Sequence, residues 1–165
     1  MAYPDGVKTS AAPAMSLDDA FRLANLLALA GWLALLGSPF APRLAQRVAG
    51  LGVTLALAAL YAGLLLAFWG AGDGAGDFAT LDGVAALFAR REVLLAGWVH
   101  YLAFDLFVGA WEVRVARRDG LPFLAVVPCL AATFLFGPAG LLLFFALRLA
   151  LRPGAGTPFP GGEAR

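Results

Sequence analysis

Four long apolar runs, almost free of charged residues, limit what this chain can fold into. Of its 165 residues 61% are hydrophobic and only 14% are charged, whereas a soluble domain of this size covers much of its surface with charge. Each run reaches the roughly 20 residues with which a helix crosses a bilayer. The pattern predicts an all-α integral membrane protein, a bundle of four transmembrane helices whose first partner is the lipid bilayer.

The net charge and the small numbers of cysteine, histidine and lysine exclude several classes of function. The formal net charge is +1, and basic residues stand in ones and twos at the ends of the apolar runs, so nucleic acid is not expected as a partner. Cys129 and His100 are the only cysteine and histidine, too few for a haem held between two histidines or for a zinc-type hydrolase site. One lysine against eleven arginines, with many Ala and Gly, is typical of a GC-rich coding sequence and favours a bacterial inner (cytoplasmic) membrane.

Capping residues and breakers predict the first two membrane helices. Ser16 and Asp19 have the spacing of an N-terminal cap, so the first helix is expected to run from there to about residue 37. The second covers about residues 48–69, where Gly50, Gly52 and Gly63 would allow close helix contacts in lipid. The composition predicts a transmembrane domain over residues 16–152, with disordered tails over residues 1–15 and 153–165.

A short amphipathic segment separates the second and third membrane helices. It follows a Gly-rich loop at residues 70–77 and covers residues 78–88, too few to span, which predicts a short interfacial or re-entrant helix. The third and fourth membrane helices are expected over about residues 92–115 and 121–151. The fourth is longer than a span needs, and Pro128 and the Gly137-Pro138 pair are places for a kink. Four spans put both termini on one side of the membrane. The connections after helices one and three are short and basic, which favours a cytoplasmic position for these two connections.

The third helix carries ionisable residues at membrane depth. Its stretch from Trp98 to Glu112 contains His100 and Asp105, and an Asp at a helix centre costs about 2.5–3.5 kcal/mol on translocon scales. Such a residue is a functional-site hypothesis. At 100° per residue, Asp105 shares a face with Trp98, Tyr101 and Glu112, while His100 lies about 140° away with a rise of about 7.5 Å. The two cannot form a dyad within the helix.

His100 and Asp105 therefore each need a partner from elsewhere. The candidates are Arg22 or Asn25 of the first helix, Thr133 of the fourth, and the hydroxyl of Tyr101. Without a nearby cation, desolvation favours a protonated Asp105, which could donate a proton to an apolar substrate. Two hypotheses stay open: a cofactor-free acid/base enzyme or binding protein for a hydrophobic small molecule, and a scaffold or assembly subunit whose polar residues pair helices. A homo-oligomer is compatible with both.

Three stretches together resemble a known family. They are FRLANLLALAGW (Phe21 to Trp32), GWVHYLAFDLFVG (Gly97 to Gly109) and VVPCLAATFLFGPAGLLLFF (Val126 to Phe145). With its W-x-H-x-x-x-x-D-L-F block followed by T-x-x-F-G-P-x-G, the chain resembles the abscisic acid-deficient-4-like family of small four-helix membrane proteins. The resemblance covers residues 21–148. Plant members of the family are required to form neoxanthin from violaxanthin.

The resemblance implies roles for particular residues. The plant reaction is a net isomerisation in which a 5,6-epoxide opens and a neighbouring proton is lost to leave an allene. It needs an acid at oxygen, a base at carbon and no redox cofactor. By resemblance Asp105 would be the acid and His100 the base, with no cofactor or metal, and a carotenoid-like substrate would contact a further set: Asn25, Trp98, Tyr101, Thr133, Gly137 and Pro138.

The remaining polar residues are expected to pair or orient helices. These are Arg22, Glu112 and Arg114. The chain departs from the family's pattern at Ala110 and Phe123, where a basic residue and, in many bacterial members, a histidine are expected. Arg114, one turn after Ala110, is the expected substitute for the basic residue.

Overall fold

The computed structural model describes residues 15–68, 76–154 and 156–158, and the regular structure in these ranges is entirely helical, with no strand. Most of the tails predicted at residues 1–15 and 153–165, and of the loop at residues 70–77, lies outside the described residues. In chain order the helices are α1 (Leu17–Leu36), α2 (Pro42–Arg47), the π-helical η1 (Val48–Val53), α3 (Thr54–Phe68), α4 (Leu81–Phe88), α5 (Arg91–Arg118), α6 (Phe123–Phe136) and α7 (Pro138–Leu151).

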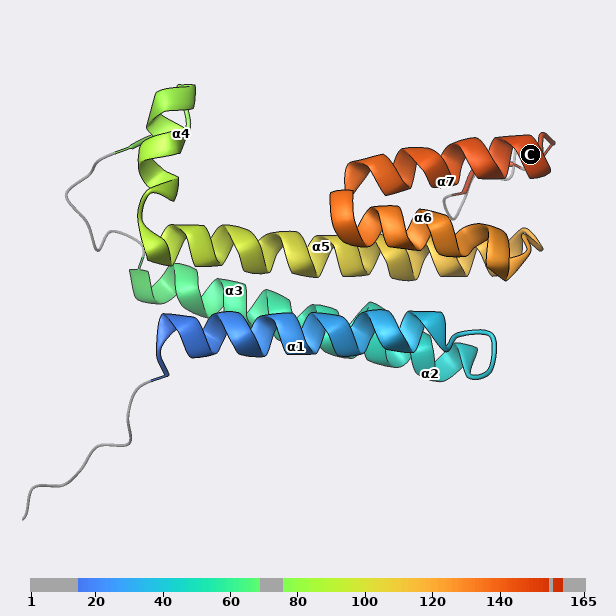
Figure 1. Ribbon diagram of the computed structural model, residues 1–165, viewed down its shortest axis with the longest axis horizontal. Coiled ribbons are helices and arrows are strands. Elements are labelled where there is room, and N and C mark those ends of the chain that lie inside the picture. The colour runs from blue at the N-terminus through green and yellow to red at the C-terminus, as the bar shows by residue number, and fades with distance from the viewer. Residues whose placement is uncertain (1–14, 69–75, 155, 159–165) are drawn as a thin grey trace, which may run out of the picture.

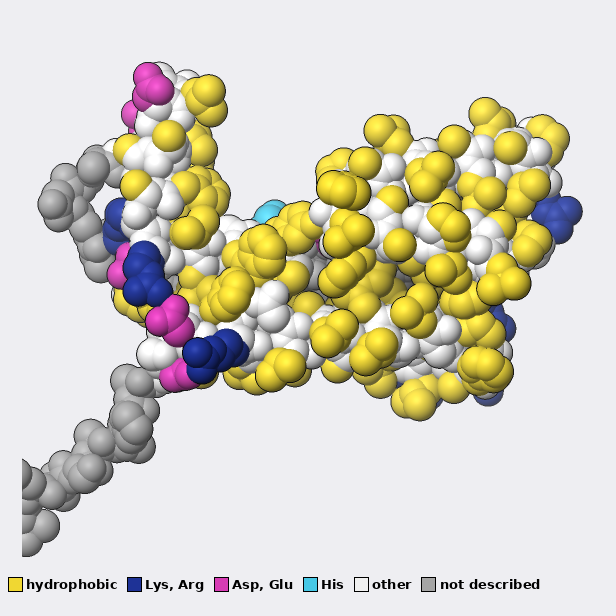
Figure 2. All heavy atoms as spheres, viewed as in Figure 1, with side chains coloured by type: hydrophobic (Ala, Val, Ile, Leu, Met, Phe, Trp, Pro, Cys, Tyr) yellow, Lys and Arg dark blue, Asp and Glu magenta, His cyan; other side chains and the backbone are white. Residues whose placement is uncertain are grey.

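Three helical segments are long and apolar enough to cross a membrane. They are α1 with 20 residues, the continuous segment Pro42–Phe68 with 27, and α5 with 28. At 1.5 Å per residue α5 is about 42 Å long, more than the roughly 30 Å of a hydrocarbon core. The three segments lie side by side (Figure 1). Large apolar side chains remain exposed over their sides, and charged side chains gather at the two ends (Figure 2), as expected of an integral membrane protein.

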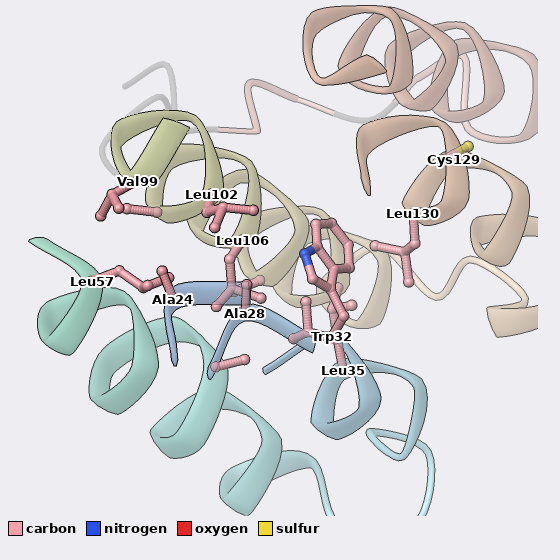
Figure 3. Packing of buried hydrophobic residues seen from close by; sticks show 14 of the residues in the cluster. Ala24, Ala28, Trp32, Leu35, Leu57, Val99, Leu102, Leu106, Cys129 and Leu130 are labelled. Atoms are coloured by element: carbon pink, nitrogen blue, oxygen red, sulfur yellow. The ribbon is translucent and has the colours of Figure 1, made fainter. Parts of the chain in front are cut away.

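Helix α5 is central, because α1, α3, α6 and α7 all contact it. Small residues of α1 allow the close approach: a Cβ on Gly31 would lie 2.5 Å from a methyl group of Leu106. Ala24, Ala28 and Trp32 of α1 meet Leu102 and Leu106 in the core (Figure 3). Helix α1 begins as predicted, since the Ser16 hydroxyl accepts a hydrogen bond from the Asp19 amide at 3.1 Å.

The fourth membrane helix is not continuous. At Gly137 the backbone takes φ 48° and ψ −102°, a conformation that favours glycine, and Pro138 cannot donate to the preceding turn. The chain reverses there, and α7 returns beside α6 as a hairpin stacked on α5 (Figure 1). Each arm has 14 residues, about 21 Å, too short to span. The prediction of one helix over residues 121–151 is wrong, and the four-helix bundle is not confirmed.

An ion pair fixes the direction of this hairpin. Arg148, near the end of α7, donates from Nε to Asp119 Oδ2 at 2.6 Å, and Asp119 directly follows α5. The start of α6 and the end of α7 therefore lie at the same end of the molecule, which is the arrangement of a re-entrant hairpin. As a consequence α1 begins and α7 ends at opposite ends of the molecule (Figure 1), so the prediction that four spans put both termini on one side is also wrong.

The short helix between the second and third spans is present as α4. Thr80 caps it by accepting from the Gly83 amide at 3.0 Å. It projects away from the end of α5, across the direction of the spanning helices (Figure 1), and both its first residue Leu81 and the preceding Phe78 are exposed. An orientation across the spanning helices is the one expected of an interfacial helix.

Candidate functional site

Helix α5 presents its polar residues to two different neighbours. Asp105 and Glu112 are buried, with relative exposures of 9% and 0%, on the side that the α6–α7 hairpin covers. His100 is exposed beside α3. The two carboxyl groups and the imidazole therefore lie on different sides of α5.

Asp105 lies under the tip of the hairpin. A Cβ on Gly137 would be only 2.8 Å from Asp105 Oδ1, so glycine is needed there for space as well as for its positive φ. One turn earlier on α5, the Tyr101 hydroxyl donates to the carbonyl of Phe134 at 3.3 Å. Asp105 Oδ2 is buried without a hydrogen-bond partner in the described part of the chain.

Glu112 lies under the middle of the hairpin, two turns beyond Asp105. Thr133 of α6 donates from Oγ1 to Glu112 Oε1 at 2.9 Å, and the pair is buried. Gly140 of α7 packs against Thr133 so closely that a Cβ there would overlap both the Thr133 backbone and its hydroxyl. Three helices thus meet at this point, α5 and α6 through side chains and α7 through its backbone, and Glu112 Oε2 has no partner among the described residues.

His100 belongs to a separate groove of about 460 Å³ between α3, α4 and α5. Its ring stacks on Phe104, with centroids 4.5 Å apart, and meets the edge of Tyr61 at 5.4 Å. The walls are apolar and aromatic, and charged residues of the α4 region and the start of α5 stand at one end. The lining residues are Tyr61, Leu64, Leu65, Phe68, Gly76, Asp77, Phe78, Leu87, Phe88, Arg90, Glu92, Val93, Ala96, Gly97 and His100.

The comparison with protein families matches the description ABA DEFICIENT 4-like over residues 19–144. The chain belongs to this family. The match includes the first two motif stretches and the third up to residue 144, and it confirms the resemblance found in the sequence. No curated protein and no solved structure matches the chain. Family membership together with the apolar helices makes the chain an integral membrane protein.

In this family member the predicted substrate-binding residues divide among three places. Asn25 accepts at Oδ1 from the Trp98 indole, 3.3 Å away, and so connects α1 with α5. Tyr101, Gly137 and Pro138 are at the hairpin tip beside Asp105, and Thr133 is with Glu112. None of these six residues lines the groove of His100, so the motif does not form one continuous site.

The residues expected to orient helices also divide. Glu112 pairs α5 with α6, and Arg114 donates to Gln46 Oε1 at 2.8 Å near the opposite end of α5 from His100. Arg22 is exposed on α1, and no ion pair connects it with Asp105 in the described ranges. Among the described residues, no three His, Cys, Asp or Glu side chains come together as a metal site would require.

Sequence reasoning missed the groove residues of α3. Tyr61 and Leu65 lie in an apolar helix without a distinct polar face, so the sequence gives no sign of which side meets His100. The amphipathic segment ending at Phe88 was the one available signal, because it required an apolar surface to pack against.

Proposed function

We propose that this protein binds an elongated, apolar polyene of carotenoid type in the groove between α3, α4 and α5. The observation that carries the proposal is the groove itself, with aromatic and aliphatic walls, one imidazole along its side and charged groups at one end. Ligand sites are typically lined by apolar side chains with a few polar groups that fix orientation. A polyene chain would lie along the apolar walls, and an oxygenated end ring would meet a polar group.

A cofactor-free isomerisation is the reaction we propose for this site. Two groups that can carry a proton lie next to each other in the groove wall, the Tyr61 hydroxyl and the His100 imidazole, and their rings are in edge contact. Opening of a ring epoxide to an allenic alcohol needs a proton at oxygen and the loss of one at carbon. Tyr61 would donate to the epoxide oxygen while His100 takes the carbon-bound proton. The protein's proton count is then unchanged over the reaction.

This assignment moves the acid away from Asp105. Because Asp105 is under the hairpin and His100 is in the groove, a ligand ring in contact with the imidazole would not reach the carboxyl group. The burial of Asp105 and Glu112 against α6 and α7 instead favours helix pairing, the role that the scaffold hypothesis gives to every polar residue. The second candidate function, a non-enzymatic scaffold, is supported by these two residues and not by His100.

Blocking the groove tests the proposal. The protein would be produced in a host that accumulates epoxy-carotenoids, purified, and examined by absorption spectroscopy and pigment chromatography. Leu65→Trp places an indole in the groove, whereas the neighbouring Leu66 is 86% exposed and does not line it, so Leu66→Trp is the matched control. We expect bound polyene with the wild type and Leu66→Trp, and none with Leu65→Trp. Equal pigment in the two variants would contradict the proposal.

The proposed location is a bacterial cytoplasmic membrane. It rests on the arginine-rich, lysine-poor composition, and the family match does not bear on it. Fractionation of the native source, with the protein followed by immunoblotting, tests this point independently of pigment binding.

A further inference from the structure

A second, larger pocket lies at the opposite end of α5 and is surrounded by arginines. It has a volume of about 820 Å³ and is formed where α2, with the preceding Ala41, meets the last turns of α5. The groove residues take no part in it. Four of its eight lining residues are basic, and no acidic residue is among them: Ala41, Pro42, Arg43, Leu44, Gln46, Arg47, Arg114 and Arg117.

Two of the arginines are positioned by neutral groups. Arg114 donates to Gln46 Oε1 at 2.8 Å, and the Gln46 amide in turn donates to the carbonyl of Ala110 at 2.9 Å. Arg117 donates to the carbonyl of Ser38 at 3.5 Å. These bonds orient the guanidinium groups and leave their positive charge uncompensated.

No carboxylate in the described part of the chain pairs with the pocket arginines. The ion pairs there involve three other arginines, which bind Asp18 or Asp119. Arg43 and Arg47 are exposed, and no hydrogen bond or ion pair involving either is seen in the described ranges. Four guanidinium groups around one hollow repel one another unless an anion lies between them.

The two ends of the molecule differ in charge. Among the described residues, the pocket end holds seven arginines and one aspartate: Arg43, Arg47, Arg114, Arg117, Arg118, Arg148, Arg152 and Asp119. At the end where α1 and α5 begin, the described part of the chain holds three arginines and five carboxylates: Arg22, Arg90, Arg91, Asp18, Asp19, Asp77, Asp82 and Glu92. The hairpin creates this asymmetry, because it brings Arg148 and Arg152 back to the end of Arg117.

We propose that the pocket binds the phosphate group of an anionic phospholipid in the cytoplasmic leaflet. Basic helix ends favour the cytoplasmic side, where anionic lipids give the membrane a negative surface potential. Arginine forks bind phosphate oxygens in a bidentate manner. Apolar surface suited to acyl chains lies next to the charge, since Leu44 lines the pocket and is 61% exposed, and the Phe107 ring is 6.0 Å below the Arg114 guanidinium.

The test uses the full chain in nanodiscs made from equal parts phosphatidylcholine and phosphatidylglycerol, with retained lipid identified by native mass spectrometry. Arg43→Gln with Arg47→Gln removes the two arginines that make no contact needed by the fold. At about 1 kcal/mol for each basic residue near an anionic surface, retention of phosphatidylglycerol should fall roughly 30-fold. Arg22→Gln with Arg91→Gln, the matched control, removes the same charge at the other end and should leave retention unchanged.

Three results would overturn the proposal. One is equal loss of phosphatidylglycerol in the two double variants, which would mean a general effect of net charge. Another is retention of phosphatidylcholine as strong as that of phosphatidylglycerol. The third is displacement of the lipid by inorganic phosphate at the same concentration, which would assign the pocket to the free anion. Pigment binding in the groove is measured in the same samples and is expected to be unaffected, so this proposal and the proposed function fail separately.

Discussion

The two sides of α5 differ in how polar groups are used. On the hairpin side, Asp105 and Glu112 are buried against backbone turns and a threonine hydroxyl, with glycines making the room. On the groove side, the interactions of His100 in the described ranges are ring contacts with Tyr61 and Phe104, and its ring is open to a ligand. Each carboxyl group keeps one buried oxygen without a hydrogen-bond partner among the described residues, so its burial is only partly compensated. The imidazole on the open side has little structural task, and we infer that this is why it is the better candidate for chemistry.

The largest expected effect is at the closest contact on the hairpin side. Gly140→Leu would force a side chain into the Thr133 backbone, and overpacking of this kind costs about 3 kcal/mol or more. Gly63→Leu is the control, because no atom lies within 4 Å of a Cβ there. We expect loss of folded protein by size-exclusion chromatography for the first variant and none for the second. Similar behaviour of the two would mean that α6 and α7 are not packed as a hairpin.

The next effect concerns the open end of the hairpin, and it depends on pH. Hydrogen bonds from Arg118 and then from Arg148 hold the pKa of Asp119 below its usual range. A carboxyl group with a lowered folded-state pKa stabilises the protein above its unfolded pKa, and this stability is lost as the pH falls through the folded value. Asp119→Asn should cost about 1.5–3 kcal/mol at neutral pH, as loss of a hydrogen bond to a charged group does.

The measurement is thermal unfolding in detergent by circular dichroism between neutral and acidic pH. The wild type should approach the stability of Asp119→Asn as the pH falls below the ordinary range of an aspartate, while the variant changes less. Asp18→Asn is the control, since its pair with Arg91 is 69% exposed on both sides and such surface pairs contribute little. Parallel pH profiles for wild type and Asp119→Asn would mean that the ion pair does not stabilise the hairpin.

A smaller effect is expected at the buried hydrogen bond between α5 and α6. Thr133→Val keeps the shape of the side chain but leaves the Glu112 carboxyl group without its donor, which costs about 1–3 kcal/mol. Thr54→Val removes only a bond to the Ala49 carbonyl within one helical segment and should cost less. The two melting temperatures are compared under one condition. If Thr54→Val is the more harmful, the polar contact does not stabilise the hairpin.

The sequence predicted the parts that depend on local chemistry. The Ser16 cap, the α4 segment, the family and the angle between His100 and Asp105 all follow from neighbouring residues or helical geometry. The hairpin does not, because a Gly-Pro pair in an apolar run is compatible with a kink as well as with a reversal. What selects the reversal is contact between residues distant in sequence, such as Asp119 with Arg148 and Glu112 with Thr133.

The sequence also did not predict where helices pack most closely. Glycines were expected to allow close approach at residues 50, 52 and 63. Gly50 does lie against Ala110 of α5. No atom of a neighbouring helix lies close to Gly63, and a Cβ on Gly52 would meet the Arg47 carbonyl of the same helical segment. Closer approaches between α1 and α5 are instead at Gly31 and Gly109, against Leu106 and Trp32. Residue size predicts that a contact can form, whereas the face that a helix turns to its neighbour depends on the whole packing.

The smallest effect on stability should accompany the largest effect on chemistry. His100→Asn removes ring contacts with Phe104 and Tyr61 and should cost at most about 1 kcal/mol, yet formation of an allenic product should fall by roughly 10²–10⁴-fold, as expected for loss of an acid/base group. Asp105→Asn is the paired variant, because it keeps the shape under Gly137 while removing the acid suggested by family resemblance. Both are measured in a host that accumulates epoxy-carotenoids, with pigment chromatography normalised to folded protein. Loss of product in Asp105→Asn with normal turnover in His100→Asn would reverse the assignment of the two sides of α5.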